Sequence, residues 1–138
     1  MDTSATSREV WLLMNDLVID NDRRRQVSEA LGMSFGRARA LRRLARRPMS
    51  MGELAAALLI DPPNATVVVD DLEAQGLVRR GAHPTDRRAK VVEATRKGKE
   101  LARRADEIIA TPPAALSALG AEDLEALRSV LARARDPE

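Results

Sequence analysis

Apolar side chains recur every three to four residues over most of this chain, and that spacing is typical of amphipathic helices. The first stripe lies in residues 4–20 and consists of Val10, Leu13, Met14, Leu17 and Val18, widened by Trp11 and Leu12. A helix that packs one face against a domain core does not need so wide an apolar stripe, so we expect a partner helix to cover part of it. A polar break at residues 20–26 then precedes one or two helical turns that end at Gly32.

A second amphipathic helix begins at Ser34, whose side chain can cap it, and ends before Pro48. Its core face consists of Phe35, Ala38, Leu41, Leu44 and Ala45, and its outer face of Arg37, Arg39, Arg42, Arg43, Arg46 and Arg47. Because its apolar face is continuous, we expect this helix to pack under the segment that follows and to support it.

Residues 50–61 contain two helix-start signals close together. Ser50 and Glu53 have the spacing of a capping box, in which each side chain bonds the backbone N–H of the other residue. Asp61 is a good N-cap, and Pro62 fits the first helical position, where its missing N–H costs nothing. Since only two residues separate the helices, they must cross at a steep angle, and this predicts a helix-turn-helix.

The second of these helices, residues 62–75, is the one that a helix-turn-helix offers to the major groove of duplex DNA. Its first turn comes nearest to the base edges, so Asn64 and Thr66 are the best candidates for base contacts. An amide can pair with adenine through two hydrogen bonds, and a threonine methyl can meet the methyl of thymine. Pro63 and Val67 lie beside them, outside the stripe that is expected to be buried, which consists of Ala65, Val68, Val69 and Leu72.

A β-hairpin is predicted after Gly76, with strand candidates at Leu77–Arg80 and Arg88–Ala94. Between them the sequence GAHPTDR carries the turn formers Gly81, Pro84 and Asp86, and residues 81–88 would form a wing. Arg87 and Arg88 are placed to reach a minor groove, whose negative potential attracts guanidinium groups. The sequence leaves open which of the two would enter it.

Three further side chains are candidates for phosphate contacts. His83 lies at the base of the wing and can reach a phosphate, the alternative being a loop histidine that is merely solvated. Ser50 and Thr85 are the other two, although the capping role of Ser50 competes for its oxygen. No metal site is expected, because the chain has no cysteine and no second histidine to complete one.

The net charge is only +2, but the charges are unevenly spread. Basic residues gather in the segment 79–99, namely Arg79, Arg80, Arg87, Arg88, Lys90, Arg96, Lys97 and Lys99, against Asp86 and Glu93. A local cationic patch is what nucleic-acid phosphates require. With one histidine, no cysteine, no tyrosine and no glycine-rich phosphate loop, the chain lacks the groups of common catalytic sites, and we expect no enzyme.

Helices are also predicted after the hairpin. Thr95 can cap one that runs to Ile109 and ends at Pro112, and a final helix covers Glu122 to Ala134. The last helix is too short and too apolar on one face to be stable alone. No apolar run is long enough to span a membrane, and the first residues lack the pattern of a signal peptide, so we expect a cytoplasmic protein.

The segment DPPNATVVVDDLEAQGLVRR, followed by HPTDRRAKVVEATRKGKEL, resembles the recognition helix, wing and next helix of the MarR family of winged helix-turn-helix transcription regulators. The resemblance implies a mainly α fold with a small β-hairpin. Residues 1–33 would form an N-terminal dimerisation region, residues 34–95 the DNA-binding part and residues 96–138 the C-terminal dimerisation helices, all in one compact unit. Asp86 and Arg88 match the Asp-x-Arg of the family's wing, where the acid orients an arginine that meets DNA.

By the same resemblance, the protein is expected to be a homodimeric repressor that reads a palindromic operator in double-stranded DNA. It is expected to need no cofactor and to respond to a small aromatic or anionic effector. An effector pocket could be lined by Trp11, Phe35, Arg37 and Arg39, the alternative being that Trp11 and Phe35 are simply core. The apolar stripes of the outer helices could likewise pack only within one monomer.

Val67 departs from the family, because many members carry an arginine or another long polar residue there. Valine cannot make a bidentate contact to guanine, so the operator of relatives cannot be assumed here. This departure keeps a second function open, that of a winged-helix module that binds a protein partner and binds DNA weakly or not at all. The basic wing favours DNA binding.

Overall fold

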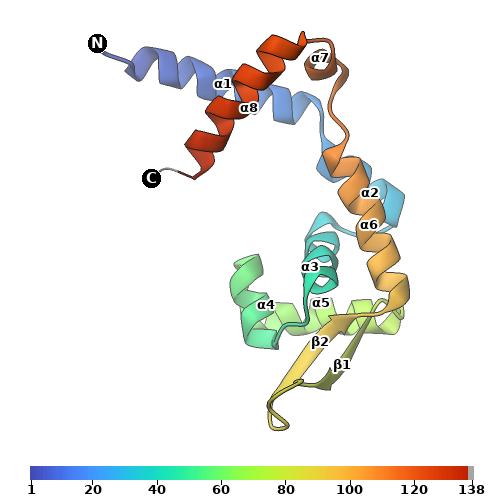
Figure 1. Cartoon of the computed structure of the whole chain (residues 1–138). Coiled ribbons are helices and arrows are strands. Elements are labelled where there is room, and N and C mark those ends of the chain that lie inside the picture. The colour runs from blue at the N-terminus through green and yellow to red at the C-terminus, as the bar shows by residue number, and fades with distance from the viewer. Residues whose placement is uncertain (137–138) are drawn as a thin grey trace.

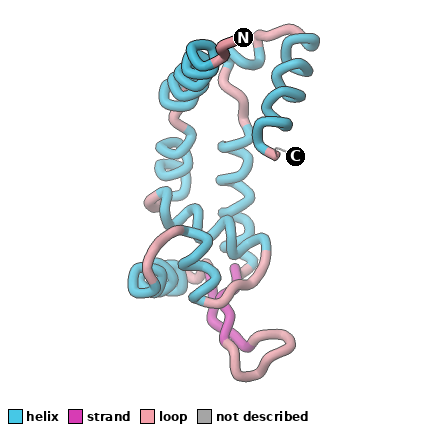
Figure 2. Tube along the Cα trace, turned by 90° about the vertical axis from the view of Figure 1, so that its left-hand side faces the viewer, coloured by secondary structure: helices cyan, strands magenta, loops and turns pink. Residues whose placement is uncertain are grey.

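The computed structural model describes residues 1–136 and is mainly helical with one β-hairpin, as the sequence predicts (Figure 1). In chain order the elements are α1 (Ser4–Asp20), α2 (Arg23–Leu31), α3 (Phe35–Arg46), α4 (Met51–Leu58), α5 (Pro62–Ala74), β1 (Val78–Ala82), β2 (Lys90–Ala94), α6 (Arg96–Ala110), α7 (Ala114–Ser117) and α8 (Ala121–Arg135). The hairpin and α8 lie toward opposite ends of an elongated molecule, and α6 runs between them (Figures 1 and 2).

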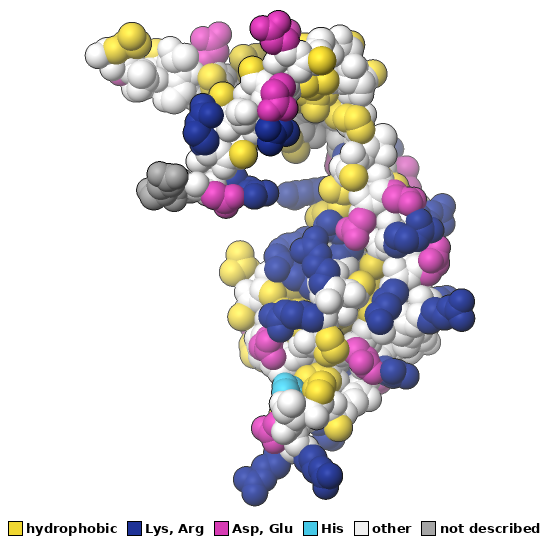
Figure 3. All heavy atoms as spheres, in the orientation of Figure 1, with side chains coloured by type: hydrophobic (Ala, Val, Ile, Leu, Met, Phe, Trp, Pro, Cys, Tyr) yellow, Lys and Arg dark blue, Asp and Glu magenta, His cyan; other side chains and the backbone are white. Residues whose placement is uncertain are grey.

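Helices α1 and α8 lie at the end remote from the hairpin, and many hydrophobic side chains are visible on the surface there (Figure 3). Within residues 1–136, neither helix contains a buried residue. The exposed large apolar side chains of these two helices are Val10, Trp11, Leu12, Leu13, Met14, Leu17, Val18, Ile19, Leu127, Val130 and Leu131. In a single chain these two helices therefore leave their apolar surface open to water.

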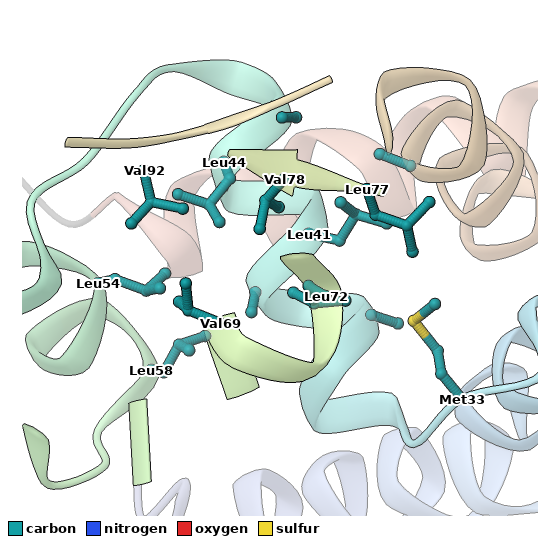
Figure 4. Packing of buried hydrophobic residues seen from close by; sticks show 14 of the residues in the cluster. Met33, Leu41, Leu44, Leu54, Leu58, Val69, Leu72, Leu77, Val78 and Val92 are labelled. Atoms are coloured by element: carbon teal, nitrogen blue, oxygen red, sulfur yellow. The ribbon is translucent and has the colours of Figure 1, made fainter. Parts of the chain in front are cut away.

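The core lies in the part of the molecule that carries the hairpin, between α3, α4, α5, the two strands and α6 (Figure 4). Fully buried leucines from α3, α4 and α5 meet there, among them Leu41, Leu54 and Leu72. Burying one leucine side chain stabilises a fold by about 1.5–3 kcal/mol, so this cluster fixes how the three helices cross. The turn between α4 and α5 uses Leu59, whose φ of 56° is left-handed.

The two strands pair antiparallel, with Val78 opposite Ala94 and Ala82 opposite Lys90. Met49, just before α4, adds a short bridge to β2: its N–H donates to the carbonyl of Val92 at 3.0 Å, and it accepts from the N–H of Val92 at 2.7 Å. The hairpin is therefore tied to the start of the helix-turn-helix as well as to its end.

The predicted helix caps are confirmed. The side chains of Ser34, Asp61 and Thr95 each accept from the N–H three residues on, and Ser50 and Glu53 form the full capping box. These local bonds satisfy N–H groups that a helix start leaves unpaired, so the helices begin where the sequence indicates.

Some predicted boundaries are wrong. The polar break at residues 20–26 is much shorter, because Asp22 caps α2 by accepting from the N–H of Arg25 at 3.1 Å. The recognition helix ends at Ala74 rather than at residue 75, and β1 begins one residue later than predicted. The second strand begins at Lys90 rather than at Arg88, and α7 was not predicted.

Candidate nucleic-acid interface

Helix α5 is anchored by one side and exposed on the other. Ala65, Val69 and Leu72 are buried against the core, while Asn64 and Thr66 are exposed and Val67 is 54% exposed. The structure therefore places the predicted base-contact candidates on the open side of the helix. Pro62 and Pro63, at the first two helical positions, are exposed beside them.

The two base-contact candidates are each held by a local hydrogen bond. Asp61 accepts from the backbone N–H of Asn64 at 2.8 Å and, through its other oxygen, from the Nδ2 of Asn64 at 2.9 Å. The hydroxyl of Thr66 donates to the carbonyl of Pro62 at 3.1 Å. The amide of Asn64 keeps its Oδ1 and its second N–H, which are the acceptor and donor that adenine recognition needs.

Helix α5 contains no lysine or arginine but three acids, Asp70, Asp71 and Glu73. Each of them pairs with an arginine of another element. Asp71 pairs with Arg37 of α3, whose Nε lies 2.8 Å from its carboxylate. Asp70 and Glu73 both pair with Arg80 of β1, and the hydrogen bond to Asp70 is the main reason that the pKa of Arg80 is raised. Sequence reasoning assigned these acids no role, although their position on one helix was visible in it.

The wing turn is organised by His83 and Asp86. The Nδ1 of His83 accepts from the backbone N–H groups of Thr85 and Asp86, each at 3.1 Å, so its ring proton is assigned to Nε2. The carboxylate of Asp86 accepts from the backbone N–H of Arg88 at 3.0 Å. By this bond Asp86 orients the backbone of Arg88. Thr85 is exposed, and its hydroxyl also lies 3.2 Å from the same His83 nitrogen.

Arg87 and Arg88 are exposed, and basic side chains project at the tip of the hairpin (Figure 3). Neither takes part in an ion pair within residues 1–136, in contrast to Arg79 and Arg80 on the first strand. Two unpaired guanidinium groups at the end of a short, locally hydrogen-bonded turn form a surface that can approach an anionic groove.

Ser50 uses its side-chain oxygen inside the protein. It accepts from the N–H of Glu53 at 3.1 Å, and its own N–H donates to the carboxylate of Glu53 at 3.2 Å. This backbone hydrogen bond is the main reason that the pKa of Glu53 is lowered, and a further bond from Arg47 adds to it. Only the hydroxyl proton of Ser50 remains available for a phosphate.

The structure does not bring the four predicted effector-pocket residues together. Phe35 lines a cavity of about 920 Å³ between the end of α1, α2, α3 and the end of α6. Arg37 and Arg39 line a separate cavity of about 300 Å³ beside α5. Trp11 is 66% exposed on α1 and lines neither of them.

The larger cavity combines apolar and cationic groups. Leu17, Phe35 and Ile109 contribute apolar surface. Arg24 and Arg42 contribute positive charge, Arg42 being paired with Asp106 at 2.5 Å, and Asp22 adds one carboxylate. The guanidinium of Arg24 lies over the ring of Phe35, 5.4 Å from its centre, which is a cation–π arrangement. Sequence reasoning missed most of these residues because α1, α2, α3 and α6 meet here only through tertiary packing.

A helix-turn-helix followed by a two-stranded wing defines the winged helix class of fold. The model of the MarR family matches residues 31–89, which cover the helix-turn-helix, β1 and the wing but not β2. Over these residues the match confirms the resemblance to the MarR family drawn from the sequence.

Solved structures extend the likeness over almost the whole chain. The transcriptional regulator BldR from Sulfolobus solfataricus is 27% identical, with 96% of this chain and 99% of BldR covered and a TM-score of 0.64. CouR from Rhodococcus jostii RHA1, solved with p-coumaroyl-CoA bound, is 23% identical, with coverage of 99% and 98% and a TM-score of 0.65. Apo MarR from E. coli is 19% identical, with coverage of 88% and 93% and a TM-score of 0.68. The chain thus has the fold of a MarR-type transcription regulator.

Among the helices of residues 1–136, none combines the length and the apolar character needed to cross a membrane. The same part of the chain holds no cluster of three or more histidine, cysteine, aspartate or glutamate side chains arranged for a metal ion.

Proposed function

We propose that this protein is a non-enzymatic transcription regulator that binds double-stranded DNA as a homodimer. Helix α5 enters the major groove, and the wing, residues 81–88, reaches the adjacent minor groove. The observation that carries the proposal is that two exposed arginines, Arg87 and Arg88, which form no ion pair within residues 1–136, lie at the tip of a hairpin that starts just after an exposed recognition helix. A genome-binding regulator acts where the DNA is, so the expected cytoplasmic location follows from this function.

Affinity and sequence reading are divided between the two elements. Because α5 has no basic side chain, attraction to phosphates comes chiefly from Arg87 and Arg88, with His83, Thr85 and Ser50 as lesser contacts. The base edges are read by the first turns of α5, chiefly by Asn64 and Thr66, while Pro63 and Val67 give apolar contact. Asp86 acts indirectly, through its bond to the backbone of Arg88.

The homodimer is proposed from the open apolar surface of α1 and α8. Leu13 and Val18 of α1 are 63% and 68% exposed, and Val130 of α8 is 52% exposed. A second copy of the chain that covers these helices removes this surface from water, and two-fold symmetry then presents two recognition helices to two half-sites. A palindromic operator is the expected target of such a dimer.

An effector site is proposed in the cavity of about 920 Å³ that Phe35 lines. The apolar side chains that line it, together with Arg24 and Arg42, suit a small aromatic or anionic molecule. Because the cavity joins α1 and α6 to the winged part, an occupant can favour one arrangement of the two over another. We propose that binding of an effector in this cavity releases the DNA and that the protein is a repressor. The first probe is p-coumaroyl-CoA, with which CouR was solved.

The test is selection of duplexes from a random pool by the purified protein, followed by light scattering to measure its mass with and without DNA. We expect a palindromic consensus and the mass of a dimer. A pool without enrichment at low salt would refute DNA reading, and a monomeric mass on the selected duplex would refute the dimer. Gel shifts with p-coumaroyl-CoA and a reporter gene downstream of the consensus then test release and repression.

A second candidate function is a winged-helix module that docks a protein partner. It is favoured by the exposed Val67 in the middle of a recognition helix that has acids and no cation. The same selection separates the two functions, because a docking module would enrich no sequence, and its weak duplex binding would not change when Asn64 is replaced.

A further inference from the structure

Arg80 joins the wing to the recognition helix. Its Nη2 donates to Asp70 at 2.6 Å, and its Nη1 donates to Glu73 at 2.7 Å. Its backbone N–H also donates to Glu73, at 3.3 Å. Asp70 and Glu73 are three residues apart and share one side of α5, so a single guanidinium connects two turns of the helix to β1. We refer to these three residues as the Arg80 bridge.

The neighbouring arginine makes a different connection. Arg79 lies opposite Glu93 in the hairpin register, and its Nε donates to that carboxylate at 2.5 Å. Both members of this pair belong to the β-hairpin, so the pair links the two strands without involving α5. The two arginines thus allow the effect of an ion pair within the hairpin to be separated from that of one between the hairpin and the helix.

The acids of the Arg80 bridge are unfavourable for DNA binding if charge alone is considered. Asp70 is on the exposed side of the helix proposed to enter the major groove, and its side chain is 62% exposed. Carboxylates near phosphates repel them and weaken association. A favourable role for these acids therefore has to come from what they hold in place.

We propose that Arg80 is a positioning residue: by binding Asp70 and Glu73 it holds the wing at one distance and angle from α5, so that both elements meet one duplex together. The inference rests on the DNA binding proposed above. Helix and wing must fit adjacent grooves at the same time, and a wing already held in place avoids the entropy cost of ordering it on binding. Arginine suits this role because its planar fork can donate to two carboxylates in fixed directions.

Fold stability and this role can be measured separately. Exposed ion pairs contribute little to the free energy of unfolding, and Asp70 and Glu73 keep substantial exposure in the bridge. Loss of the bridge should thus leave the fold intact while the wing moves more freely. The affinity for DNA then reports on positioning.

The decisive variant is Asp70→Ala/Glu73→Ala, tested on the duplex that the wild-type protein selects. Alanine is a good helix former, so α5 is retained. If only charge mattered, removing two acids would tighten binding; the positioning role predicts binding about five- to tenfold weaker. The salt dependence of affinity should keep its slope, because no phosphate contact is lost. Glu93→Ala is the matched control: it removes an acid from β2, outside the wing, but leaves the bridge, and its binding should be unchanged or tighter.

Arg80→Lys separates the fork from the charge. Lysine keeps the cation but cannot donate to both carboxylates in the same planar geometry, so the variant should weaken binding to a similar extent. The proposal is overturned if the double alanine variant binds as tightly as the wild type or tighter, or if Arg80→Lys keeps wild-type affinity. It is also overturned if replacing Arg80 by an uncharged residue lowers the slope of log affinity against log salt by about 0.9, since a drop of that size marks a lost phosphate contact.

A measurement without DNA keeps this proposal distinct from the proposed function. Nitrogen-15 relaxation of the free protein should show faster and wider motion of wing amides 81–89 in the double alanine variant, with wild-type behaviour in Glu93→Ala. Equal wing motion in all three proteins would refute the bridge whatever the DNA result. Failure of the wild-type protein to bind any duplex would refute the proposed function, while the relaxation result would still judge the bridge.

Discussion

Helix α5 and the wing follow each other in sequence and lie side by side, yet they differ in charge and in how they are held. Helix α5 is fixed by Ala65, Val69 and Leu72 in the core and carries acids but no cation. The wing projects from the core, ends on Arg87 and Arg88, and its turn is held by hydrogen bonds of its own. The difference suggests that orientation and base reading belong to the helix and attraction to phosphates belongs to the wing.

This division has a physical advantage. A helix that lacks cations gains little from random phosphates, so its contribution to binding depends on matching bases. The wing supplies attraction that is the same for all sequences, and the salt dependence of binding should therefore follow the wing. Substitutions in the two elements should accordingly change different measured quantities.

The largest expected effect comes from removing the cations of the wing tip. Arg87→Ala/Arg88→Ala should weaken binding to selected and random duplexes alike, by about a hundredfold per wing at 50 mM salt, because each phosphate contact adds about 0.9 to the salt slope. The slope should fall by about 1.8 per wing in a salt titration. Arg128→Ala, which removes an exposed arginine of α8 paired with Glu125, serves as the control and should leave both quantities unchanged. A slope that stays constant in the wing variant would show that the wing does not touch phosphates.

Asn64→Ala should act on specificity instead. Loss of a bidentate amide contact costs about 1–3 kcal/mol of discrimination at one base pair, so the selected consensus should lose information at a single position of each half-site. The salt slope should stay at the wild-type value, since no ionic contact is removed. Selecting duplexes from a random pool with the variant protein measures this loss of information directly. A consensus identical to that of the wild type would exclude Asn64 from base reading.

The fold could be predicted from sequence largely because its signals are local. Caps such as Ser34, Asp61 and Thr95 act within three residues of their own position, and the structure confirms each of them. For the same reason the apolar stripes of α3 and α5 identified their buried sides, whereas the stripes of α1 and α8 contain no buried residue in the described chain. Boundaries failed where a local bond was overlooked, as with Asp22 before α2 and Asp86 in the wing turn.

The site was less predictable because much of it depends on distant contacts. Arg37 was assigned to an effector pocket, but it pairs with Asp71, 34 residues away, and such a pair exists only once α3 and α5 have packed. The cavity near Phe35 likewise depends on distant contacts, because residues 15–42 and residues 109–116 line it together only in the folded chain. The acids of α5 were visible in the sequence, yet their partners were not.

Val67→Arg tests the different roles of α5 and the wing in the opposite way, because it gives α5 the cation that it lacks. Val67 is 54% exposed, so an arginine can be accommodated without disturbing the core. Binding to random duplexes should tighten by about tenfold per site at 50 mM salt, with the salt slope rising by about 0.9. Val67→Gln is the uncharged control and should leave the slope unchanged. If Val67→Arg does not alter the slope, α5 does not approach the phosphates closely enough to contact them.

The smallest effect is expected for Asp86→Ala, which leaves both wing-tip arginines in place but removes a negative charge and the acceptor for the N–H of Arg88. A turn that has lost one such bond samples more conformations, so part of the binding free energy is spent on ordering it, and affinity should fall by about threefold to tenfold. Removing an acid from a DNA-facing loop would by charge alone tighten binding, so weaker binding identifies orientation as the role of Asp86. Asp86→Asn retains an acceptor oxygen without the charge. If it binds more tightly than Asp86→Ala, the hydrogen bond matters; if both variants bind as tightly as the wild type, the wing tip works without that bond and its affinity comes from the number of cations alone.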